Sequence, residues 1–298
     1  MKKLFCFGMG YSSQWLGQYL LKESWEVSGT VRNTSKIASL NEMGFNVYPW
    51  SNGIQADEVM KGITEATHIL ISIPPDEEGD MVIRNFETDF AHSPFLEWVG
   101  YLSSTGVYGH HNGGWVDESS PLKPRLNKTK NRILAERNCM SLFIKYEIPI
   151  HIFRLAGIYG PNRNVLKSLQ DGKAHRIKKK NHVFSRIHIE DIIITLLASI
   201  EKPHPGSIYN IADDEPAPHA DVVAYGACLL GILPPPLIDF EKAKISNMAK
   251  AFYTESRQVK NSRIKADFGI KLKYPTYREG LKKIARDFVM EPQKRLHN

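Results

Sequence analysis

The chain has 298 residues, of which 42% are hydrophobic and 24% are charged, and its formal net charge is +7 at pH 7. This length suits one two-lobed domain or two modest domains, and the composition is that of an ordinary soluble protein. No run of 18 apolar residues occurs and the N-terminus lacks a signal-peptide pattern. We therefore exclude a membrane partner and expect a cytoplasmic location.

The three cysteines lie far apart in apolar segments, without the spacing of a metal site or a disulfide framework. We expect Cys6, Cys139 and Cys228 to be buried free thiols. The sequence predicts no metal site.

Most of the positive charge is spread along the chain, and one cluster stands out, which we call the basic segment. It contains Lys173, His175, Arg176, Lys178, Lys179 and Lys180. Because this segment is short and has no interleaved aromatic residues, we expect a solvated hairpin turn and no nucleic-acid partner. A phosphate-bearing small-molecule substrate stays open as a partner, and the oligomeric state stays open between monomer and homodimer.

The N-terminus reads as a strand, a glycine turn and a helix. An apolar run over residues 3–7 leads into Gly8 and Gly10, and a helical pattern follows. Gly8 allows a tight turn, Gly10 lets the backbone approach a pyrophosphate, and the amides at a helix start bind anions. The inward face of this helix is expected to carry Trp15, Leu16, Tyr19 and Leu20. The pattern predicts a dinucleotide site at Gly8, Gly10, Tyr11, Ser12 and Ser13.

Ser13 stands where the usual third glycine of this fingerprint would be. Its side chain is small enough to let the helix pack on the strand, and its hydroxyl can donate to a phosphate. The alternative is an ordinary strand-to-helix turn without a ligand.

A second strand is predicted over residues 25–32, and it ends in a cation. An acidic residue at this position would accept from the ribose hydroxyls of NAD, whereas Arg32, with Lys36 nearby, suits the 2′-phosphate of NADP. The sequence therefore predicts NADP as the preferred cofactor over NAD. The alternative is surface charge at the end of a strand.

Further strands are predicted over residues 45–50, 67–73, 99–103, 149–155 and 207–212. The run 67–73 is almost continuously apolar, as a parallel strand buried on both faces should be, and it stops at a pair of prolines. In an open α/β sheet a nucleotide ribose rests where such a strand ends. We therefore add Ile73, Pro74 and Pro75 to the predicted cofactor site.

Strands alternating with helical segments predict an α/β fold with a doubly wound parallel sheet. A dinucleotide-binding domain is predicted for residues 1–165, continued by 186–212, and a smaller substrate-binding lobe for 166–185 and 213–298. The segment 186–212 contains an amphipathic helix over 189–200. His188 and Asp191 at its first turn are expected to cap it.

Four ordered segments resemble the extended short-chain dehydrogenase/reductase superfamily: the opening glycines, YLSSTGVYG at 101–109, RLAGIYGP at 154–161 and RIHIED at 186–191. The resemblance spans residues 1 to about 290, since YPTYREG at 274–280 also looks like the end of such proteins. These are NAD(P)-dependent epimerases and dehydratases of nucleotide sugars. The resemblance implies a Rossmann-type sheet, a small C-terminal substrate lobe and oxidoreductase or epimerase chemistry.

The resemblance also assigns site residues. The family serine that hydrogen-bonds the reacting oxygen of the substrate lies five residues before the glycine of V-Y-G, which is Ser104 here. The alternative for Ser104 is a turn former at the end of a strand. The substrate-facing residues are predicted to be Tyr108, Tyr159, Asn162 and Arg186.

One departure from the family concerns its general acid, the tyrosine of Y-x-x-x-K. Counting back from Glu136 places Arg132 at the lysine position and Lys128 at the tyrosine position, and no tyrosine occurs between Tyr108 and Tyr146. Arginine still offers a fixed cation to the nicotinamide ribose. Proton transfer would need Lys128, Tyr108, Tyr11 or a water. Two functions therefore stay open: an oxidoreductase or epimerase acting on a hydroxyl-bearing small molecule, and an NAD(P)-binding sensor or assembly protein.

Overall fold

The computed structural model describes residues 1–51, 57–246, 250 and 252–295. The chain divides into two compact units. Unit 1 contains residues 1–107, 124–155 and 192–209, and unit 2 contains residues 108–123, 156–191 and 210–298. The predicted assignment of one domain to the dinucleotide and one lobe to the substrate stays a prediction.

A seven-stranded sheet forms the centre of the fold, in the order β3-β2-β1-β4-β5-β7-β11. Its strands are β1 (Lys3–Phe7), β2 (Glu26–Val31), β3 (Asn46–Pro49), β4 (His68–Ile71), β5 (Trp98–Ser104), β7 (Ile150–Leu155) and β11 (Ser207–Ile211). The pairs from β3 to β7 are parallel. The amide of Gly206 bonds Ile150 O and that of Ala156 bonds Ile211 O, so β11 runs parallel to β7 as well. The predicted parallel sheet is confirmed.

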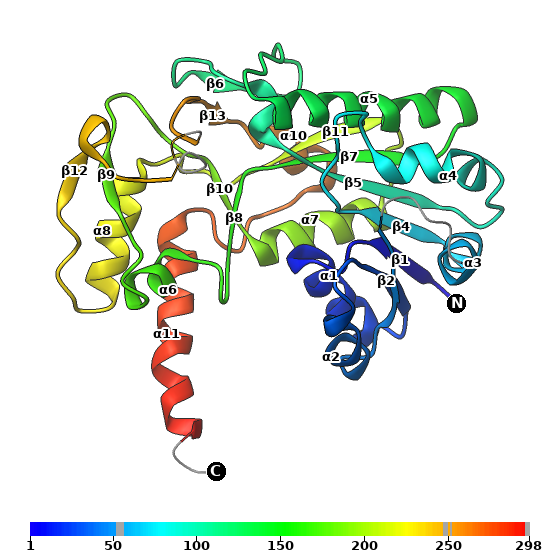
Figure 1. Ribbon diagram of the computed structural model, residues 1–298, viewed down its shortest axis with the longest axis horizontal. Helices are drawn as coiled ribbons and strands as arrows, with labels where there is room; N and C mark the ends of the chain where they lie inside the picture. Colours follow the sequence, from blue (N-terminus) through cyan, green and yellow to red (C-terminus); the bar gives the residue numbers. More distant parts are fainter. Residues whose placement is uncertain (52–56, 247–249, 251, 296–298) are drawn as a thin grey trace. The chain divides into compact units, whose positions relative to one another are not determined.

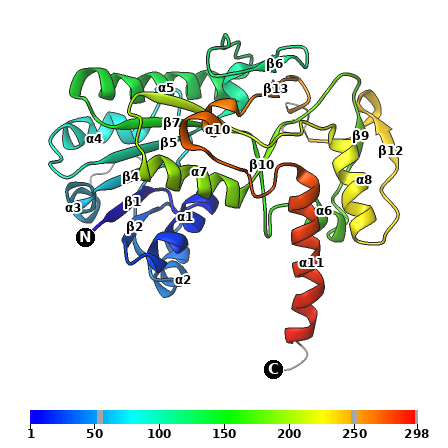
Figure 2. The ribbon, with the colours of Figure 1, turned by 180° about the vertical axis from the view of Figure 1, so that it is seen from behind.

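Helices cover both faces of this sheet, as Figures 1 and 2 show: α4 and α5 lie on one face, α1 and α7 on the other. The helices that connect or follow the strands of this sheet are α1 (Tyr11–Lys22), α2 (Ile37–Glu42) after the short η1 (Thr34–Lys36), α3 (Asp57–Glu65), α4 (Met81–Ala91), α5 (Asn127–Tyr146) and α7 (Ile189–Glu201). Aromatic and branched residues of β1, β4, β5 and β7 pack against α3, α4 and α5 in a buried core. The strand order reverses between β1 and β4, which makes the carboxyl ends of these two strands the switch point of the fold.

The packing of α1 differs from the prediction. Its buried residues are Ser12, Ser13, Leu16, Gly17 and Leu20. Tyr19 is 47% exposed, because the helix approaches the sheet through small residues. A Cβ added to Gly17 would lie 2.7 Å from the ring of Phe45, so a larger residue would push the helix away.

Unit 2 contains three two-stranded parallel sheets, β10–β8, β12–β9 and β13–β6. Its elements are β6 (Trp115–Val116), β8 (Gly157–Tyr159), α6 (Val165–Gln170), β9 (Arg176–Lys178), β10 (Arg186–His188), α8 (His219–Leu229), β12 (Leu237–Asp239), η3 (Phe240–Lys242), β13 (Gln258–Val259), α10 (Ser262–Phe268) and α11 (Tyr277–Arg295). The short η2 (Thr105–Tyr108) precedes it in the chain. The core of this unit includes Tyr159, Leu166, Tyr277 and Leu281.

Two expectations are wrong in detail. The basic segment is not a hairpin, because its residues 176–178 form β9 and pair in parallel with the distant β12. Cys228 is exposed, while Cys6 and Cys139 are buried as expected. Asp191 lies in the first turn of α7, as expected, and it also accepts hydrogen bonds from the amides of Lys273 (2.6 Å) and Tyr274 (3.1 Å), so it anchors the segment before α11.

His188 does take the expected place before α7, where its Nδ1 accepts from the Glu190 amide at 3.2 Å. None of the described helices is both long enough and apolar enough to cross a membrane. Within the described ranges, no three histidine, cysteine or acidic side chains gather in a way that could hold a metal ion.

Candidate functional site

The glycine turn after β1 is held by hydroxyl groups on both neighbouring strands. The Gly8 amide donates to Thr30 Oγ1 at 3.0 Å, and Ser72 Oγ donates to Gly8 O at 2.7 Å. Gly8 has φ +94°, and an added Cβ would lie 2.7 Å from Ile73 Cγ2. A residue with a side chain at position 8 would be strained by the positive φ and would collide with Ile73, so this tight turn requires glycine.

Gly10 precedes α1 and faces open space. It has extended backbone angles, no side chain caps the helix, and a Cβ added here would meet no atom within 4 Å. The first amides of a 12-residue helix have no intrahelical partner and carry a partial positive charge. An open approach to such amides at a switch point fits the pyrophosphate of a dinucleotide.

The predicted phosphate-binding residues differ in their exposure. Tyr11 is half-buried, Ser12 is nearly buried and Ser13 is fully buried. The Ser13 hydroxyl lies 3.0 Å from Ser72 Oγ, which ties α1 to the end of β4. Ser13 therefore packs the helix onto the strand, and its predicted contact with a phosphate stays a prediction.

The other predicted cofactor residues lie at the same carboxyl edge of the sheet. Arg32 follows the last residue of β2, is exposed, and forms no ion pair within the described part of the chain. Ile73, Pro74 and Pro75 follow β4, and the side chain of Ile73 packs on the glycine turn. Because β2, β1 and β4 are adjacent and parallel, these residues flank the glycine turn on both sides.

Ser104 is the last residue of β5 and is half-buried. Its hydroxyl accepts from the Gly106 amide at 3.0 Å and so shapes the turn that follows the strand. This contact uses one lone pair, so the hydroxyl proton of Ser104 is free to be donated to another oxygen.

The start of α5 carries Lys128 and Arg132 four residues apart, on one face of the helix. Lys128 is exposed. Arg132 is half-buried, and its Nη1 donates to Leu102 O at 2.8 Å and to the Tyr101 hydroxyl at 3.3 Å. The only tyrosine of α5 is its last residue, Tyr146. The structure therefore places a cation at the lysine position of the family motif, and the phenol beside this cation belongs to Tyr101 of β5 and not to α5.

Glu136, one turn further along α5, is the centre of a buried polar network. It accepts from Ser103 Oγ at 2.5 Å and from Arg154 Nη2 at 2.7 Å and Nε at 3.1 Å. The three side chains come from β5, α5 and β7, and all are buried. The network fixes the position of α5 against the sheet and hence the position of Arg132 along it.

Several residues that shape this region were missed in the sequence. Thr30 and Ser72 hold the glycine turn. Ser72 is a hydroxyl residue directly after a largely apolar strand, which is the signal that could have identified it, whereas Thr30 lies in a strand with other polar residues and gives no such signal. The pair Glu136 and Arg154 joins two consecutive elements, α5 and β7, but the sequence analysis did not pair these two side chains.

The four predicted substrate residues lie in unit 2 and are mostly buried. The hydroxyl of Tyr108 donates to Asn210 Oδ1 at 2.7 Å. The hydroxyl of Tyr159 lies 3.4 Å from Thr276 O, within the core of the unit. Asn162 has φ +60° in the exposed turn between Gly160 and Arg163. The contacts of Tyr108 and Tyr159 are structural, and substrate contacts for all three residues stay predictions.

Arg186 is also buried, and its Nη1 donates to Phe184 O at 2.8 Å and to Ala217 O at 3.0 Å. Beside it, both carboxylate oxygens of Asp213 lack a hydrogen-bond donor among the described residues. Burial raises the pKa of Asp213 well above its ordinary value, against the opposing charge of Arg186.

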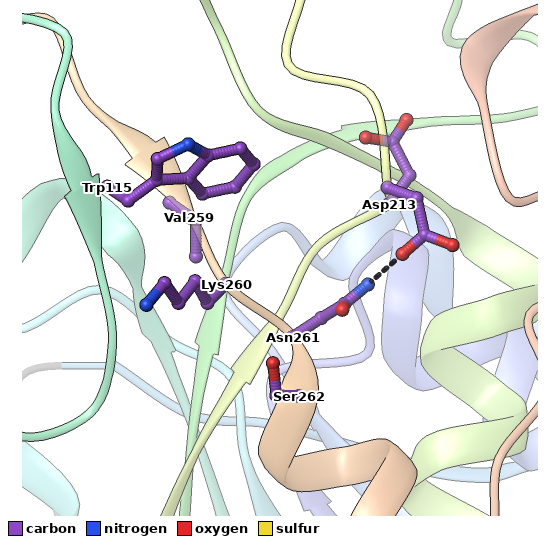
Figure 3. Close-up of a pocket in the computed structure, with 7 residues that line it drawn as sticks. Trp115, Asp213, Val259, Lys260, Asn261 and Ser262 are labelled. Atoms are coloured by element: carbon purple, nitrogen blue, oxygen red, sulfur yellow. Dashed lines mark hydrogen bonds between the residues drawn. The ribbon is translucent and has the colours of Figure 1, made fainter.

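Unit 2 also contains a pocket of about 300 Å³ (Figure 3). Its lining residues are Trp115, Asp213, Asp214, Val259, Lys260, Asn261 and Ser262. The Asn261 side chain is fixed there by Asp214 Oδ1 at 2.7 Å and by Ala212 O at 2.8 Å. None of the predicted site residues lines this pocket.

Comparison with known proteins gives the following relatives. No protein-family model matches the chain. Protein YeeZ of Escherichia coli K12 is 27% identical over 92% of this chain and 97% of its own length. The dTDP-D-glucose 4,6-dehydratase of Homo sapiens is 29% identical over 41% of this chain and 37% of its own length.

Two solved structures extend the comparison. A functionally unknown conserved protein from Silicibacter pomeroyi is 41% identical, with a TM-score of 0.88, over 97% of this chain and 99% of that one. The dTDP-glucose 4,6-dehydratase of Bacillus anthracis, solved in complex with NAD, is 16% identical, with a TM-score of 0.79, over 98% of each chain. The dehydratase shares the fold along the whole chain. The chain therefore has the fold of this dehydratase and, over part of its length, is similar in sequence to the human enzyme.

Proposed function

We propose that this protein binds NAD(P) and acts as an oxidoreductase or epimerase/dehydratase on a hydroxyl-bearing small molecule, with a nucleotide sugar as the candidate substrate. The observation that carries the proposal is the glycine turn at the switch point, where Gly8 is held by Thr30 and Ser72 and Gly10 faces open space. A bound dinucleotide would supply the hydride acceptor and donor.

The side chains at the carboxyl edge have separate roles in this proposal. The amides of Tyr11, Ser12 and Ser13 hold the pyrophosphate at the start of α1. Ser104 donates its hydroxyl proton to the reacting oxygen of the substrate. Arg132 provides the fixed positive charge that the family takes from lysine.

We further propose a preference for NADP over NAD. The exposed guanidinium of Arg32 lies at the end of β2, beside the glycine turn, and has no ion-pair partner within the described part of the chain. A 2′-phosphate would give it a charge-assisted hydrogen bond. The dehydratase of Bacillus anthracis was solved with NAD, so this preference is a specific difference to test.

Substitution of Gly10 tests the binding site. Because a Cβ at this position meets no protein atom within 4 Å, Gly10→Val should fold normally while its side chain occupies the space of the pyrophosphate. We expect dinucleotide binding to be lost in a fluorescence or calorimetric titration, with thermal unfolding unchanged. Unchanged affinity in the folded variant would refute the glycine-turn site.

The second candidate function is an NAD(P)-binding sensor or assembly protein. It is favoured by the start of α5, which carries no tyrosine and where Arg132 is bonded to a backbone carbonyl of β5.

The two functions differ in whether the protein turns over a substrate. An enzyme should oxidise, reduce or epimerise some member of a panel of nucleotide sugars and small alcohols, and Ser104→Ala should slow it without changing dinucleotide affinity. Tight dinucleotide binding without any turnover across the panel would support the sensor.

A further inference from the structure

Arg132, in the second turn of α5, is fixed to β5 through one of its nitrogens. Its Nη1 donates to Leu102 O at 2.8 Å and to the Tyr101 hydroxyl at 3.3 Å. A guanidinium has more N–H donors than these two contacts use. None of the described residues accepts from Nε or Nη2 or forms an ion pair with Arg132. One edge of this side chain is therefore tied to the sheet, and its other donors remain available to a ligand.

The partner Tyr101 is itself firmly placed. It is fully buried in β5, opposite Ile71 of β4 and Ile152 of β7. Its hydroxyl contacts Arg132 and no other described residue. Burial raises the pKa of Tyr101, so this group stays a neutral phenol, and a buried phenol normally needs a hydrogen-bond partner. Arg132 therefore satisfies the hydroxyl, and the hydroxyl in return restrains Arg132.

The helix end of Arg132 is restrained as well. Glu136, one turn further along α5, is bonded to Ser103 of β5 and to Arg154 of β7. The guanidinium carbon of Arg132 lies 6.0 Å from the centre of the Tyr101 ring, at the outer limit of a cation–π contact. Because the side chain is held at both ends before any ligand arrives, binding needs to order it less.

We propose that Tyr101 is a positioning residue: its hydroxyl, together with Leu102 O, holds Arg132 so that the remaining donors of the guanidinium are presented to the dinucleotide. This inference rests on the proposed function, in which Arg132 is the fixed cation. Tyr101 is fully buried, so it acts only through Arg132. Without the hydroxyl, Arg132 keeps only its contact with Leu102 O, and dinucleotide binding has to order a more mobile side chain.

Two matched variants isolate the hydroxyl. Tyr101→Phe removes it and keeps the ring in the core. The control is Tyr209→Phe, which makes the same change at another fully buried tyrosine of the same sheet, where the hydroxyl lies 3.0 Å from His204 Nδ1. Tyr209 is on β11, two strands away from β5. Thermal unfolding and near-UV circular dichroism check that both variants are folded.

The first test uses the protein without any ligand. The NMR signal of the Arg132 Nε–H group, assigned by its loss in Arg132→Gln, reports the mobility of this side chain through its heteronuclear NOE. We expect a high value in wild type and in Tyr209→Phe, and a clearly lower value in Tyr101→Phe. An equal value in wild type and Tyr101→Phe would overturn the positioning role.

The second test measures NAD and NADP affinity by calorimetry. Tyr101→Phe should weaken binding about three- to tenfold, as for the loss of one hydrogen bond to a charged group, and Tyr209→Phe should leave it unchanged. Arg132→Gln removes the group through which Tyr101 acts, so adding Tyr101→Phe to it should cause little further loss. A merely structural role would weaken binding by the same factor in both backgrounds, and that result would overturn the proposal.

Failure of this proposal is distinguishable from failure of the proposed function. If wild-type protein binds neither NAD nor NADP, the proposed function is wrong, and the NMR measurement still decides whether Tyr101 restrains Arg132. If wild-type protein binds a dinucleotide and Tyr101→Phe binds it equally well, the positioning role is wrong and the proposed function stands.

Discussion

The glycine turn after β1 and the start of α5 lie in the same unit but differ in what they depend on. The turn is fixed by backbone conformation, by Thr30 and Ser72 and by the absence of side chains at Gly8 and Gly10. The start of α5 depends on the identity of the side chains at Lys128 and Arg132, and there the family acid is missing. In the proposed function, dinucleotide binding therefore depends on one region and proton transfer on the other, and a substitution can test each one separately.

Restoring the family motif should have the largest effect. Lys128→Tyr combined with Arg132→Lys would supply a phenol with a neighbouring ammonium, and a positioned general acid contributes about 10²- to 10⁴-fold to rate. We expect turnover on a responsive substrate to rise toward that range, measured by nicotinamide absorbance. The control is Lys130→Tyr with Arg132→Lys, because Lys130 is exposed and does not share the helix face of Lys128. Equal rates in both double variants would show that α5 does not present residue 128 to the reaction.

Breaking the buried network should cost the most stability. Arg154→Met leaves the Glu136 carboxylate buried without its cation, which typically costs about 3 to 5 kcal/mol of unfolding free energy. Urea unfolding followed by circular dichroism measures this cost. Lys283→Met is the control, because its ion pair with Asp287 is about half exposed and should contribute little. Equal losses in the two variants would contradict a special role for the network at the start of α5.

The preference for NADP over NAD tests the region around the glycine turn, where Arg32 lies. Arg32→Ala should lower NADP affinity about ten- to a hundredfold and leave NAD affinity nearly unchanged, because only NADP carries the 2′-phosphate. Titration of both dinucleotides into both proteins gives the result. Tighter binding of NAD than NADP by wild-type protein would show that the assignment of Arg32 is wrong.

The smallest effect is expected at the basic segment, which belongs to neither region. Changing Lys178, Lys179 and Lys180 to glutamate should not alter dinucleotide affinity. Wild-type protein should form no specific complex with DNA or RNA at physiological salt, whereas neutralised phosphates would give affinity a steep salt dependence. A tight, salt-sensitive complex in a filter-binding assay, lost in the triple variant, would contradict a small-molecule function.

The sheet and the glycine turn could be predicted from the sequence because local residue patterns encode both. The apolar run that becomes β4 and the spacing of Gly8 and Gly10 each follow from neighbouring residues. The pairing of β9 with β12 joins distant segments, and no short pattern encodes it. The ion pair between Glu136 and Arg154 joins the consecutive elements α5 and β7, but it depends on how the helix packs on the sheet, which no short pattern encodes. Helix α3 was not predicted. In α1 the predicted burial of Leu16 and Leu20 is confirmed, but small residues and not Tyr19 complete the buried face.

The Ser103, Glu136 and Arg154 network has a consequence for how such a chain evolves. Because it anchors α5 one turn beyond Arg132, the helix keeps its register whatever residues occupy positions 128 and 132. Replacement of a catalytic tyrosine there would cost little folding free energy, so selection for a folded protein would not oppose it. A lineage could thus lose one chemistry and acquire another at an unchanged scaffold position, while the Rossmann-type sheet stayed as stable as before.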